Sequence, residues 1–437
     1  MVIYGGDEVA ALVLDIGSSS LRAGYAGDDT PKAVIPTAYG YTVEQDQEGG
    51  DVAMTEATAE GEQTETPPKR TKLYVGQNGP SVWREGMEVG DPVRNGLITD
   101  FTPMPSLISH TLTEVMRCNP AEHPILVTEA PWNTPANRER MAEIIFEEFQ
   151  APAFYIANTG VLNAFAAGKG SALVVDIGHT EASVTPVVDG FVLRKGLAHS
   201  SLPTLVRAHT KHLLTYPAYG RQGIQLFPHQ LIAAKQTVDA GAAARFTLRE
   251  DRVVGTTETW KAWYEARESE EWMQSVAGVL DQGWNDQLAA QKGARHYEFP
   301  TGYNTYFGVD RLLVGEQYFT HSPQLQASNS DLPKTIPALI SQALTACDPD
   351  IRQVLLGNVV LTGGGSLLSG LSDRLQNELS RNVSHSKVHA PGNPAERRFG
   401  GWLGGSILAS LGTFHQLWIS KEEWQEHGKA IVSQRCK

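Results

Sequence analysis

Cysteine is scarce in this chain of 437 residues, because only Cys118, Cys347 and Cys436 occur. Their spacing matches no cysteine-based metal site, and an odd number cannot pair completely within one chain. A disulfide scaffold and a zinc module are therefore excluded. We expect the protein to fold in a reducing compartment.

Long apolar runs and a surplus of basic residues are also missing. The sequence contains no run of about 18 apolar residues, which a membrane-spanning helix would need. The first ten residues contain Asp7 and Glu8 in place of the basic and apolar regions of a signal sequence, which argues against one. Lys and Arg number 36 against 49 Asp and Glu, which gives a net charge of -13. We therefore expect no membrane contact, and any DNA contact to be local or indirect.

The acidic residues are concentrated in the segment 43–66. It contains no basic and no aromatic residue, and its acidic residues are Glu44, Asp46, Glu48, Asp51, Glu56, Glu60, Glu62 and Glu65. Such a composition buries too little apolar surface to offset the entropy of ordering the chain. The segment is predicted to be a flexible surface insertion within a domain.

Residues 11–18 and 172–179 are two copies of one pattern. Each copy is an apolar run that ends in Asp-Ile-Gly, at Asp15 and at Asp176, and a second apolar segment follows each. The pattern predicts two β-hairpins with tight glycine turns. Two copies at a domain-sized separation indicate two similar α/β halves that face each other across a cleft.

Signals for helices alternate with those for strands elsewhere in the chain, as in an α/β protein. Thr134 and Pro135 predict the start of a helix after the strand-like residues 125–127. Residues 203–332 break this rhythm and are interpreted as a helical insertion in the second half.

The repeated turn has the chemistry of a phosphate site. An Asp-x-Gly turn followed by hydroxyl residues directs several backbone N–H groups to one point, which suits an anion. Asp15 and Asp176 would lie near the same phosphates, and their like charges would need a divalent cation such as Mg²⁺, bound directly or through water. One such turn alone is usually an ordinary hairpin. The duplication, together with the glycines 363–365, favours a nucleotide site.

These motifs resemble the family of actin and the actin-related proteins over nearly the full length of the chain. The segments that carry the resemblance are 15–29, 123–131, 176–178, 363–364 and 402–419. Three further segments are most similar to a nuclear subfamily of the actin-related proteins, namely 4–9, 130–134 and 297–304. The resemblance implies an α/β, actin-like ATPase fold, with two similar domains around a nucleotide cleft.

The same resemblance divides the chain into four lobes. They would be a first large lobe of residues 1–36, 93–166 and 400–437, a small lobe of 37–92, a second large lobe of 167–202 and 333–399, and an inserted helical lobe of 203–332. The acidic segment would then lie in the small lobe.

ATP and Mg²⁺ are the ligands that the resemblance implies. Carried over position by position, the residues around ATP would be Gly17, Ser18, Ser19, Ser20, Leu21, Arg22, Gly178, His179, Thr180, Glu271, Gly364, Gly365, Leu367, Leu368 and Arg398. The metal would lie near Asp15 and Asp176. Arg22 replaces the family's lysine, His179 replaces an aspartate of actin, and Thr204 replaces a glycine near the base.

Thr159 and Ser183 align with the glutamine and histidine that position the attacking water in actins. Short hydroxyl side chains reach less far and accept a proton poorly near pH 7. We therefore expect ATP binding with little or no hydrolysis, and no catalytic residues.

The resemblance implies a nuclear structural subunit of chromatin-remodelling and histone acetyltransferase complexes, with roles in transcription regulation and DNA repair. Its partners would be conventional actin and a scaffold helix of a remodeller ATPase or acetyltransferase-complex subunit, bound in a groove near Phe165, Leu408 and Leu411. Ile407, Leu411 and Phe414 predict one apolar face on a helix over 402–418. An indirect contact with histones or the nucleosome stays open.

Two alternatives remain at this point. The protein could be a slow actin-like ATPase or filament-forming cytoskeletal protein, which Thr159, Ser183 and the acidic segment disfavour. It could also be an interaction module without nucleotide, which the two phosphate turns disfavour.

Overall fold

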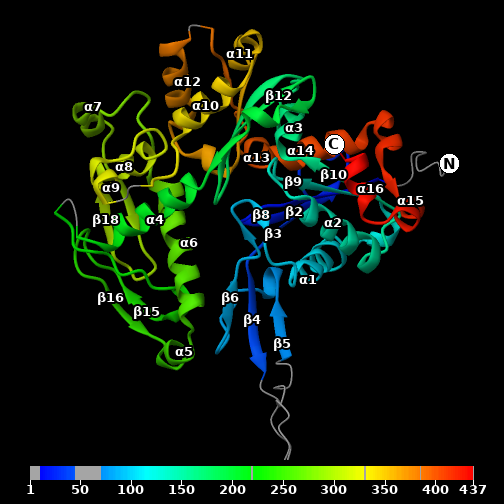
Figure 1. Cartoon of the computed structure of the whole chain (residues 1–437). Coiled ribbons are helices and arrows are strands. Elements are labelled where there is room, and N and C mark those ends of the chain that lie inside the picture. The colour runs from blue at the N-terminus through cyan, green and yellow to red at the C-terminus, as the bar shows by residue number, and fades with distance from the viewer. Residues whose placement is uncertain (1–9, 45–69, 218–219, 329–330, 384, 437) are drawn as a thin grey trace, which may run out of the picture.

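Two mixed β-sheets form the frame of the molecule (Figure 1). The computed structural model describes residues 10–44, 70–217, 220–328, 331–383 and 385–436. The first sheet has the order β21 (Ile419–Ser420), β10 (Ala153–Asn158), β9 (Ile125–Glu129), β1 (Leu12–Ile16), β2 (Ser20–Tyr25) and β3 (Ala33–Pro36). The second has the order β13 (Phe191–Val192), β12 (Ala182–Val188), β11 (Ala172–Ile177), β19 (Val359–Thr362) and β20 (Val388–His389), with β14 (Ala198–Ser200) beside β12.

The centres of the two sheets are built alike. In each, an antiparallel hairpin, β1–β2 or β11–β12, is extended by a parallel strand, β9 or β19. Asp15 pairs with Arg22 in the first hairpin, and Asp176 pairs with Ser183 in the second. The two predicted hairpins and the α/β fold class are confirmed.

The apolar runs of both hairpins are buried because both faces of each sheet are covered. Leu12 and Leu14 point into one core cluster, while Val13 between them points into another, beside Trp402. Successive side chains of a strand alternate between its faces, so a strand buried on both sides needs a continuous apolar sequence. The second sheet repeats this arrangement, with separate core clusters on its two faces.

Helices α3 (Thr159–Ala166) and α14 (Gly400–Ser410) cross between the two halves at very short range. A Cβ atom at Gly404 would lie 1.9 Å from the carbonyl oxygen of Leu162, so only glycine fits at this crossing. Asn163 of α3 also accepts a hydrogen bond from Thr362 of β19, at 3.2 Å. The crossing therefore joins the first half to the second sheet.

Two smaller regions lie beyond the large sheets (Figure 1). One contains the sheet β5 (Arg70–Tyr74), β4 (Tyr39–Glu44) and β6 (Glu88–Gly90). The other contains α4 (Leu202–Thr215), α5 (Glu250–Val254), α6 (Glu258–Val276), α7 (Asp286–Gln291), α8 (Asp310–Glu316) and the two-stranded sheets β15 (Ile232–Gln236) with β16 (Arg245–Leu248) and β17 (Arg295–Glu298) with β18 (Asn304–Phe307).

Residues 203–332, which we interpreted as a helical insertion, are only partly helical, since four of these strands fall within them. Strands of four or five residues give little periodicity, and polar residues in them obscure the pattern further. The four lobe boundaries stay a prediction. The acidic segment lies outside the described residues except for Val43 and Glu44. No helix in the described ranges is long and apolar enough to cross a membrane.

Two helix predictions had different outcomes. Thr134 caps α2 (Pro135–Glu143) as expected, because its hydroxyl accepts a hydrogen bond from the backbone of Asn137 at 3.2 Å. The single helix over 402–418 is wrong, because α14 ends at Ser410 and residues 412–417 form a 3₁₀ helix. Leu411 is extended and Gly412, a poor helix former, follows it. This turn brings Phe414 into the core against Tyr155, with ring centroids 4.9 Å apart.

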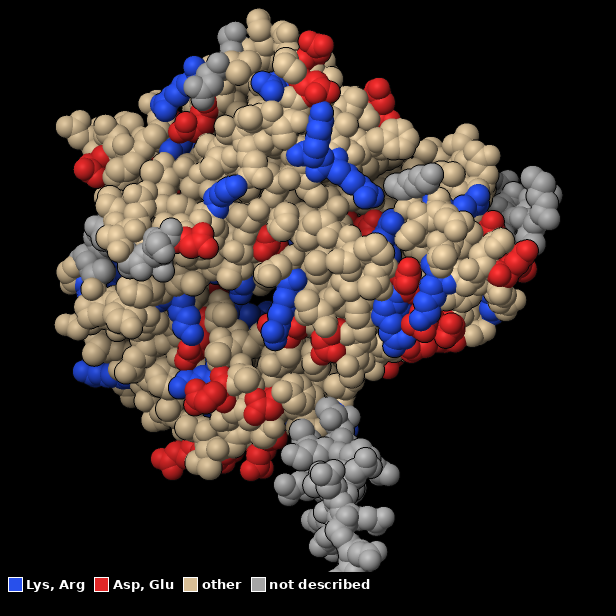
Figure 2. All heavy atoms as spheres, in the orientation of Figure 1, with Lys and Arg blue, Asp and Glu red and all other residues tan. Residues whose placement is uncertain are grey.

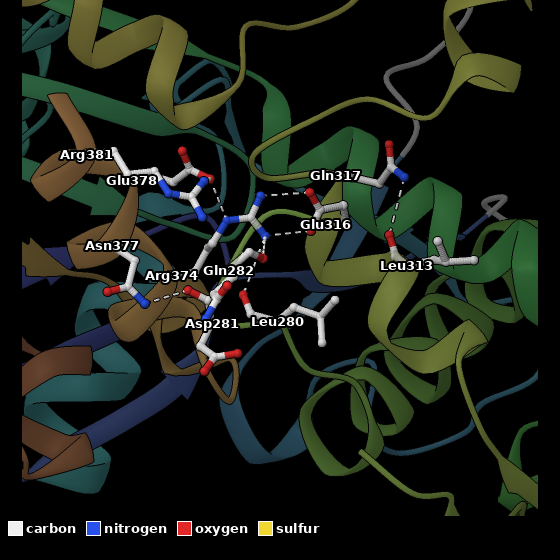
Figure 3. A network of polar contacts seen from close by, with 10 residues as sticks. All are labelled: Leu280, Asp281, Gln282, Leu313, Glu316, Gln317, Arg374, Asn377, Glu378 and Arg381. Carbon is white, nitrogen blue, oxygen red and sulfur yellow. Dashed lines mark hydrogen bonds and ion pairs between the residues drawn. The ribbon is translucent and has the colours of Figure 1, made fainter. Parts of the chain in front are cut away.

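A buried arginine fixes the helices of the second half (Figure 3). Arg374, in α12 (Leu371–Asn382), is 1% exposed and donates two hydrogen bonds to Glu316 of α8, at 2.7 and 2.8 Å. It also donates to the carbonyl oxygen of Gln282 at 2.7 Å. Buried charges need such bidentate pairing to offset their desolvation, so Arg374 ties α8, α12 and the 280–282 segment together.

Candidate nucleotide site

A cavity of about 440 Å³ lies between the turns of the two repeated hairpins. Figure 2 shows the molecular face hollowed between the halves, with basic and acidic side chains at the rim. The expected site residues that line the cavity are Asp15, Gly17, Ser18, Ser19, Arg22, Asp176, Gly178, His179, Thr180, Gly364, Gly365, Leu367, Leu368 and Arg398. Its size falls within the range of small-molecule sites.

The two turns have the same backbone geometry and contact each other. The N–H of Gly17 donates to the carbonyl oxygen of Ser20 at 3.0 Å, and the N–H of Gly178 donates to that of Glu181 at 2.9 Å. Across the cleft, the hydroxyl of Thr180 donates to the hydroxyl of Ser18 at 3.0 Å. The two copies of the sequence repeat therefore meet at one point of the cavity.

Several backbone donors at this point have no protein acceptor. Within the described ranges, the amide groups of Ser18, Ser19, His179 and Thr180 donate no hydrogen bond. Unpaired amides of two facing turns form a concavity that suits an anion. The residues present thus fit a phosphate group.

Asp15 is already neutralised by its neighbours. Arg22 donates to one carboxylate oxygen at 2.5 Å, and Thr128 at the end of β9 donates to the other at 2.6 Å. The side chain of Asp15 is 8% exposed, so its charge is held in a site with little water. A metal near Asp15 would therefore be bound through water, or would displace one of these donors.

Asp176 is the less compensated carboxylate. It forms no hydrogen bond or ion pair in the described part of the chain. Burial, and then the negative charge of Asp15, raise the pKa of Asp176 to about 6. A divalent cation between phosphates and Asp176 would remove this electrostatic cost. No cluster of three or more His, Cys, Asp or Glu side chains that could bind a metal occurs among the described residues, so water and phosphate would supply the other Mg²⁺ ligands.

His179 changes the charge of the second turn. Burial, together with the positive charges of Arg207 and Arg267, lowers the pKa of His179 to about 3. The imidazole is therefore neutral near pH 7, and its Nδ1 lies 3.5 Å from a carboxylate oxygen of Glu270. Glu270 in turn forms an ion pair with Arg207 of α4.

Glu270 and Arg207 are site residues that the sequence analysis missed. The family resemblance implied Glu271, which is exposed and does not line the cavity, whereas Glu270 does. Consecutive residues of a helix point about 100° apart, so an error of one position moves the side chain out of the site. No local motif marks Arg207 or Glu270, because the contact joins two helices that are far apart in the sequence.

Two other expected residues lie behind the turn rather than in the cavity. The side chain of Leu21 is fully buried in the core of the first half, and that of Ser20 is 5% exposed. Neither lines the cavity. They can support the turn, but only their backbone is placed to take part in it.

Thr159 and Ser183 both line the cavity, one from each half. Thr159 begins α3, and Ser183 lies in β12 opposite Asp176. The hydroxyl of Ser183 makes no hydrogen bond within the described ranges. The cavity therefore has short hydroxyls where a water-positioning base would be needed.

The glycine turn after β19 brings the backbone close to the cavity. Gly363 has φ +87°, and a Cβ there would lie 2.3 Å from a carboxylate oxygen of Asp176. A Cβ at Gly364 would meet no atom within 4 Å, although Gly364 lines the cavity. Gly363 is thus required by the fold, while Gly364 leaves free space on the cavity side. Arg398, whose guanidinium lies 5.6 Å from the Phe399 ring centroid, borders the same region.

An aromatic contact joins the two halves at another edge of the cavity. Trp132, which lines the cavity, stacks on His199 of β14, with ring centroids 4.3 Å apart and planes inclined by 8°. The indole N–H of Trp132 donates to the carbonyl oxygen of Asn95 at 3.0 Å. The stack closes one side of the cleft.

The expected partner groove is only partly apolar surface. Leu411 is 46% exposed and Ile407 is 37% exposed, whereas Phe414 is buried at 2%. Phe165 and Leu408 are half-buried. Phe414 therefore belongs to the core, and the other four side chains remain accessible at least in part.

Comparison with known proteins shows the family of the chain. The family model described as Actin matches residues 6–437. The chain is 39% identical to actin-related protein 4 of Yarrowia lipolytica, over 98% of this chain and 95% of that protein. It is 35% identical to the proteins of the same name in Mycosarcoma maydis and Arabidopsis thaliana, over 99–100% of each chain. With its two related sheets, the facing turns between them and a family match over residues 6–437, the chain belongs to the actin family.

Proposed function

We propose that this protein is a nuclear, ATP-binding structural subunit of chromatin-remodelling and histone acetyltransferase complexes. The observation that carries the proposal is its full-length similarity, at 34–39% identity, to proteins named actin-related protein 4 in fungi and plants. Actin-family proteins bind nucleotide in general, and the cavity between the facing turns supports this for the present chain.

The residues of the cavity divide into three groups in this proposal. The turns around Ser18 and Thr180 would bind the phosphates of ATP, and the glycines 364–365 with Arg398 would border the nucleoside. Asp176, and Asp15 through water, would bind Mg²⁺, which would neutralise charge between the carboxylates and the phosphates. Neutral His179 would add no negative charge beside the phosphates, unlike the aspartate at this position in actin.

Hydrolysis would be slow because neither Thr159 nor Ser183 can act as an effective base at the position of the attacking water. Thr159 and Ser183 lack a pKa near 7 and extend only a short distance from their Cα atoms. Bound ATP would then stabilise the closed structure instead of driving a cycle. At a concentration one hundred times Kd, a ligand that binds only the folded state adds about 2.7 kcal/mol to the free energy of unfolding.

The nucleotide released from protein purified from its native source tests this proposal. We expect mass spectrometry to find ATP at close to one molecule per chain, and phosphate release to be far slower than from conventional actin under the same conditions. The double variant Thr159→Gln with Ser183→His should raise phosphate release if these positions control hydrolysis. Recovery of ADP together with turnover at the rate of actin would contradict the proposal and favour the slow-ATPase alternative.

The assembly role requires a partner test. We propose that a long scaffold helix binds in the groove beside Phe165, Leu408 and Leu411, since an amphipathic helix can insert apolar side chains into such a groove. Conventional actin would be a second partner on the same scaffold. Leu411→Asp should remove this protein from the complex without lowering its melting temperature, because Leu411 is 46% exposed. Val254→Asp, at a residue 88% exposed elsewhere, is the control. Unchanged co-purification of the Leu411 variant would show that this groove is not the docking surface.

A further inference from the structure

A carboxylic acid without a partner is buried in helix α6. Glu268 is 6% exposed, and both of its carboxylate oxygens are buried and accept no hydrogen bond from any described residue. Tyr264 and Trp272 lie four residues before and after it on the same face of the helix, and both aromatic side chains are buried. An ionised carboxylate in such surroundings loses its hydration without compensation.

The groups nearest to Glu268 make its ionisation harder still. On α6 itself, Glu265 and Glu271 lie about one turn away on either side, and both carry negative charge. Opposite the helix, burial and then the charges of Glu271 and Glu268 raise the pKa of the Tyr297 hydroxyl in β17 to about 12. This neighbour is therefore a neutral phenol near pH 7 and supplies no positive charge.

The cations of the adjacent helix α4 are engaged with other carboxylates. Lys211 donates to Glu265 at 2.8 Å, and Arg207 forms an ion pair with Glu270. Neither cation forms an ion pair with Glu268. The two ion pairs between α4 and α6 thus leave the buried carboxyl group uncompensated.

The charged side chains of the other elements that pack against α6 are also engaged. In α8, Asp310 forms an ion pair with Arg221, and Arg311 donates to the backbone carbonyl oxygens of residues 292–293. On β6, Glu88 accepts a hydrogen bond from the first turn of α6. The remaining titratable side chains of this surface lie against aromatic rings, Arg267 against Trp263 and His229 against Tyr264.

These surroundings set the pH range in which Glu268 changes the stability of the fold. Burial, and then the charges of Glu265 and Glu271, raise the pKa of Glu268 from 4.5 to about 8. The folded protein therefore keeps a proton that the unfolded chain has lost, over the interval from about pH 5 to about pH 8. The stability that this group contributes at low pH is lost as pH rises through that interval. Neutral pH lies inside it.

Helix α6 connects this carboxyl group to the wall of the cavity. Glu270, Met273 and Gln274 follow within six residues on other faces of the helix and line the cavity. Trp272 and Val276 anchor the same turns in the core of the second half. Since α6 is one continuous helix of 19 residues, a loosening at Glu268 would also affect the cavity wall.

We propose that Glu268 is a pH-sensitive switch, whose protonated form keeps α6 packed against β17, and that α6 opens more often as pH rises through neutrality. The neutral acid needs little hydration, whereas the ionised form is stable only when local opening brings water to it. Each opening event releases one proton to solvent. The switch goes beyond the proposed function, because it requires neither a nucleotide nor a partner.

Hydrogen exchange of the α6 backbone amides at several pH values tests the switch. Each measured rate is divided by the intrinsic rate of an unfolded peptide at the same pH, which leaves the equilibrium of local opening. In the unmodified protein, opening of residues 264–276 should increase by up to about tenfold per pH unit from about pH 5.5 to about pH 7.5, because one proton is released.

Glu268→Gln is the direct variant, because the amide has the shape of the protonated acid and cannot ionise. The ratio of opening in the unmodified protein to opening in this variant should grow by up to about tenfold per pH unit over the same interval. Other groups that titrate in this range affect both proteins and cancel in the ratio. A ratio that stays constant over this interval would overturn the inference.

Glu258→Gln is the matched control, since Glu258 is an exposed glutamate in the first turn of the same helix. Its opening should follow that of the unmodified protein at every pH. A pH dependence altered equally by Glu258→Gln and by Glu268→Gln would also overturn the inference, because the effect would then belong to the charge of the helix and not to the buried group.

Glu271→Gln tests the switch without a change at the buried position, and so remains informative if Glu268→Gln does not fold. Glu271 is exposed, so its substitution leaves the core packing unchanged. The variant removes a like charge that opposes the ionisation of Glu268, so the increase in opening should level off at a lower pH than in the unmodified protein. Opening that levels off at the same pH in both proteins would contradict the assignment to Glu268.

Discussion

The two hairpins of the repeat differ in how their aspartates are compensated, although their backbones match. Asp15 and Asp176 occupy equivalent positions, and the parallel strand beside each carries a threonine near the aspartate. Thr362 of β19 pairs with Asp176 in the sheet, and Thr128 of β9 contacts Asp15. Thr128 donates to Asp15, whereas Thr362 donates to Asn163 and to the carbonyl oxygen of Arg397. The same scaffold thus holds one satisfied carboxylate and one that forms no hydrogen bond or ion pair with any described residue.

The residues that pair with the two aspartates across each hairpin also differ in whether they compensate the carboxylate. Arg22 stands opposite Asp15 and forms an ion pair with it, while Ser183 stands opposite Asp176 and makes no hydrogen bond with it in the described ranges. The carboxylate of Asp15 is therefore compensated without a ligand. The carboxylate of Asp176 has no such partner among the described residues, which is the property expected of the side that requires a cation.

The largest expected effect follows from steric contact in the second hairpin. Gly363→Ala should lower the free energy of unfolding by about 3 kcal/mol or more, because the new Cβ would lie 2.3 Å from Asp176 at a backbone φ of +87°. Gly364→Ala is the control, since its Cβ meets no atom within 4 Å. Thermal and chemical unfolding measure both. Equal stability of the two variants would show that β19 can move away from Asp176.

Removal of one charge from each hairpin should change stability in opposite directions. Arg22→Gln leaves the buried carboxylate of Asp15 without its cation and should cost about 2–4 kcal/mol. Asp176→Asn removes an uncompensated charge and should stabilise the nucleotide-free protein by about 1–3 kcal/mol at pH 7. Chemical unfolding without nucleotide measures both. Effects of the same sign would mean that the two aspartates are equally compensated.

The Asp176→Asn effect should depend on pH. Because the folded pKa of about 6 lies above the usual value of 3.8, the folded protein binds more protons than the unfolded chain between these values. The unmodified protein therefore loses stability from this group as pH rises from about 4 to 6. The advantage of Asp176→Asn should grow over that interval and stay constant above it. An advantage that is the same at pH 4.5 and pH 7 would contradict the assignment to Asp176.

Substitution of Thr128 and Thr362 should reveal a smaller difference in stability between the two hairpins. Thr128→Val removes a hydrogen bond to an ionised carboxylate and should cost roughly 1.5–2 kcal/mol. Thr362→Val removes hydrogen bonds to neutral groups and should cost only about 1 kcal/mol. Unfolding in urea resolves the difference. A larger cost at Thr362 would show that its link to α3 matters more than the charge of Asp15.

The smallest effect concerns the histidine of the second turn. His179 has a folded pKa of about 3, below the usual 6.5, so the unfolded chain binds more protons over this interval and stability falls as pH decreases through it. His179→Gln should remove this loss, which amounts to about 1 kcal/mol at pH 5.5 relative to pH 7.5. Exposed His427 provides the matched control, His427→Gln. Identical pH profiles for both variants would show that His179 is protonated in the folded protein.

Local patterns predicted the local structure well. The two Asp-Ile-Gly motifs and their flanking apolar runs specify the hairpins, because a tight turn and two-sided burial leave clear marks in the sequence. Thr134 likewise marks the start of α2. The break after Ser410 was missed because the apolar spacing continues through Leu411, and only the core position of Phe414 explains the turn.

Contacts between distant segments were not predictable in the same way. The choice of Glu271 instead of Glu270 shows that alignment to a family can misplace a helix of a divergent region by one residue. Arg207, Trp83 and Trp260 have ordinary local sequences. Arg207 gains its role only when α4 packs against α6, and Trp83 and Trp260 gain theirs only when the two small regions meet, so a single sequence contains no pattern for them.

The close crossing of α3 and α14 has a mechanical consequence. Gly404 allows α14 to touch the backbone of α3 at Leu162, which leaves little freedom for the helices to slide. A movement of one half relative to the other would then be a hinge rotation about this crossing and not a sliding movement. Displacement grows with distance from a pivot, and the contact between α6 and β6 lies far from it (Figure 1). Because this contact is far from the rotation axis, a few side chains there can limit the rotation of one half relative to the other.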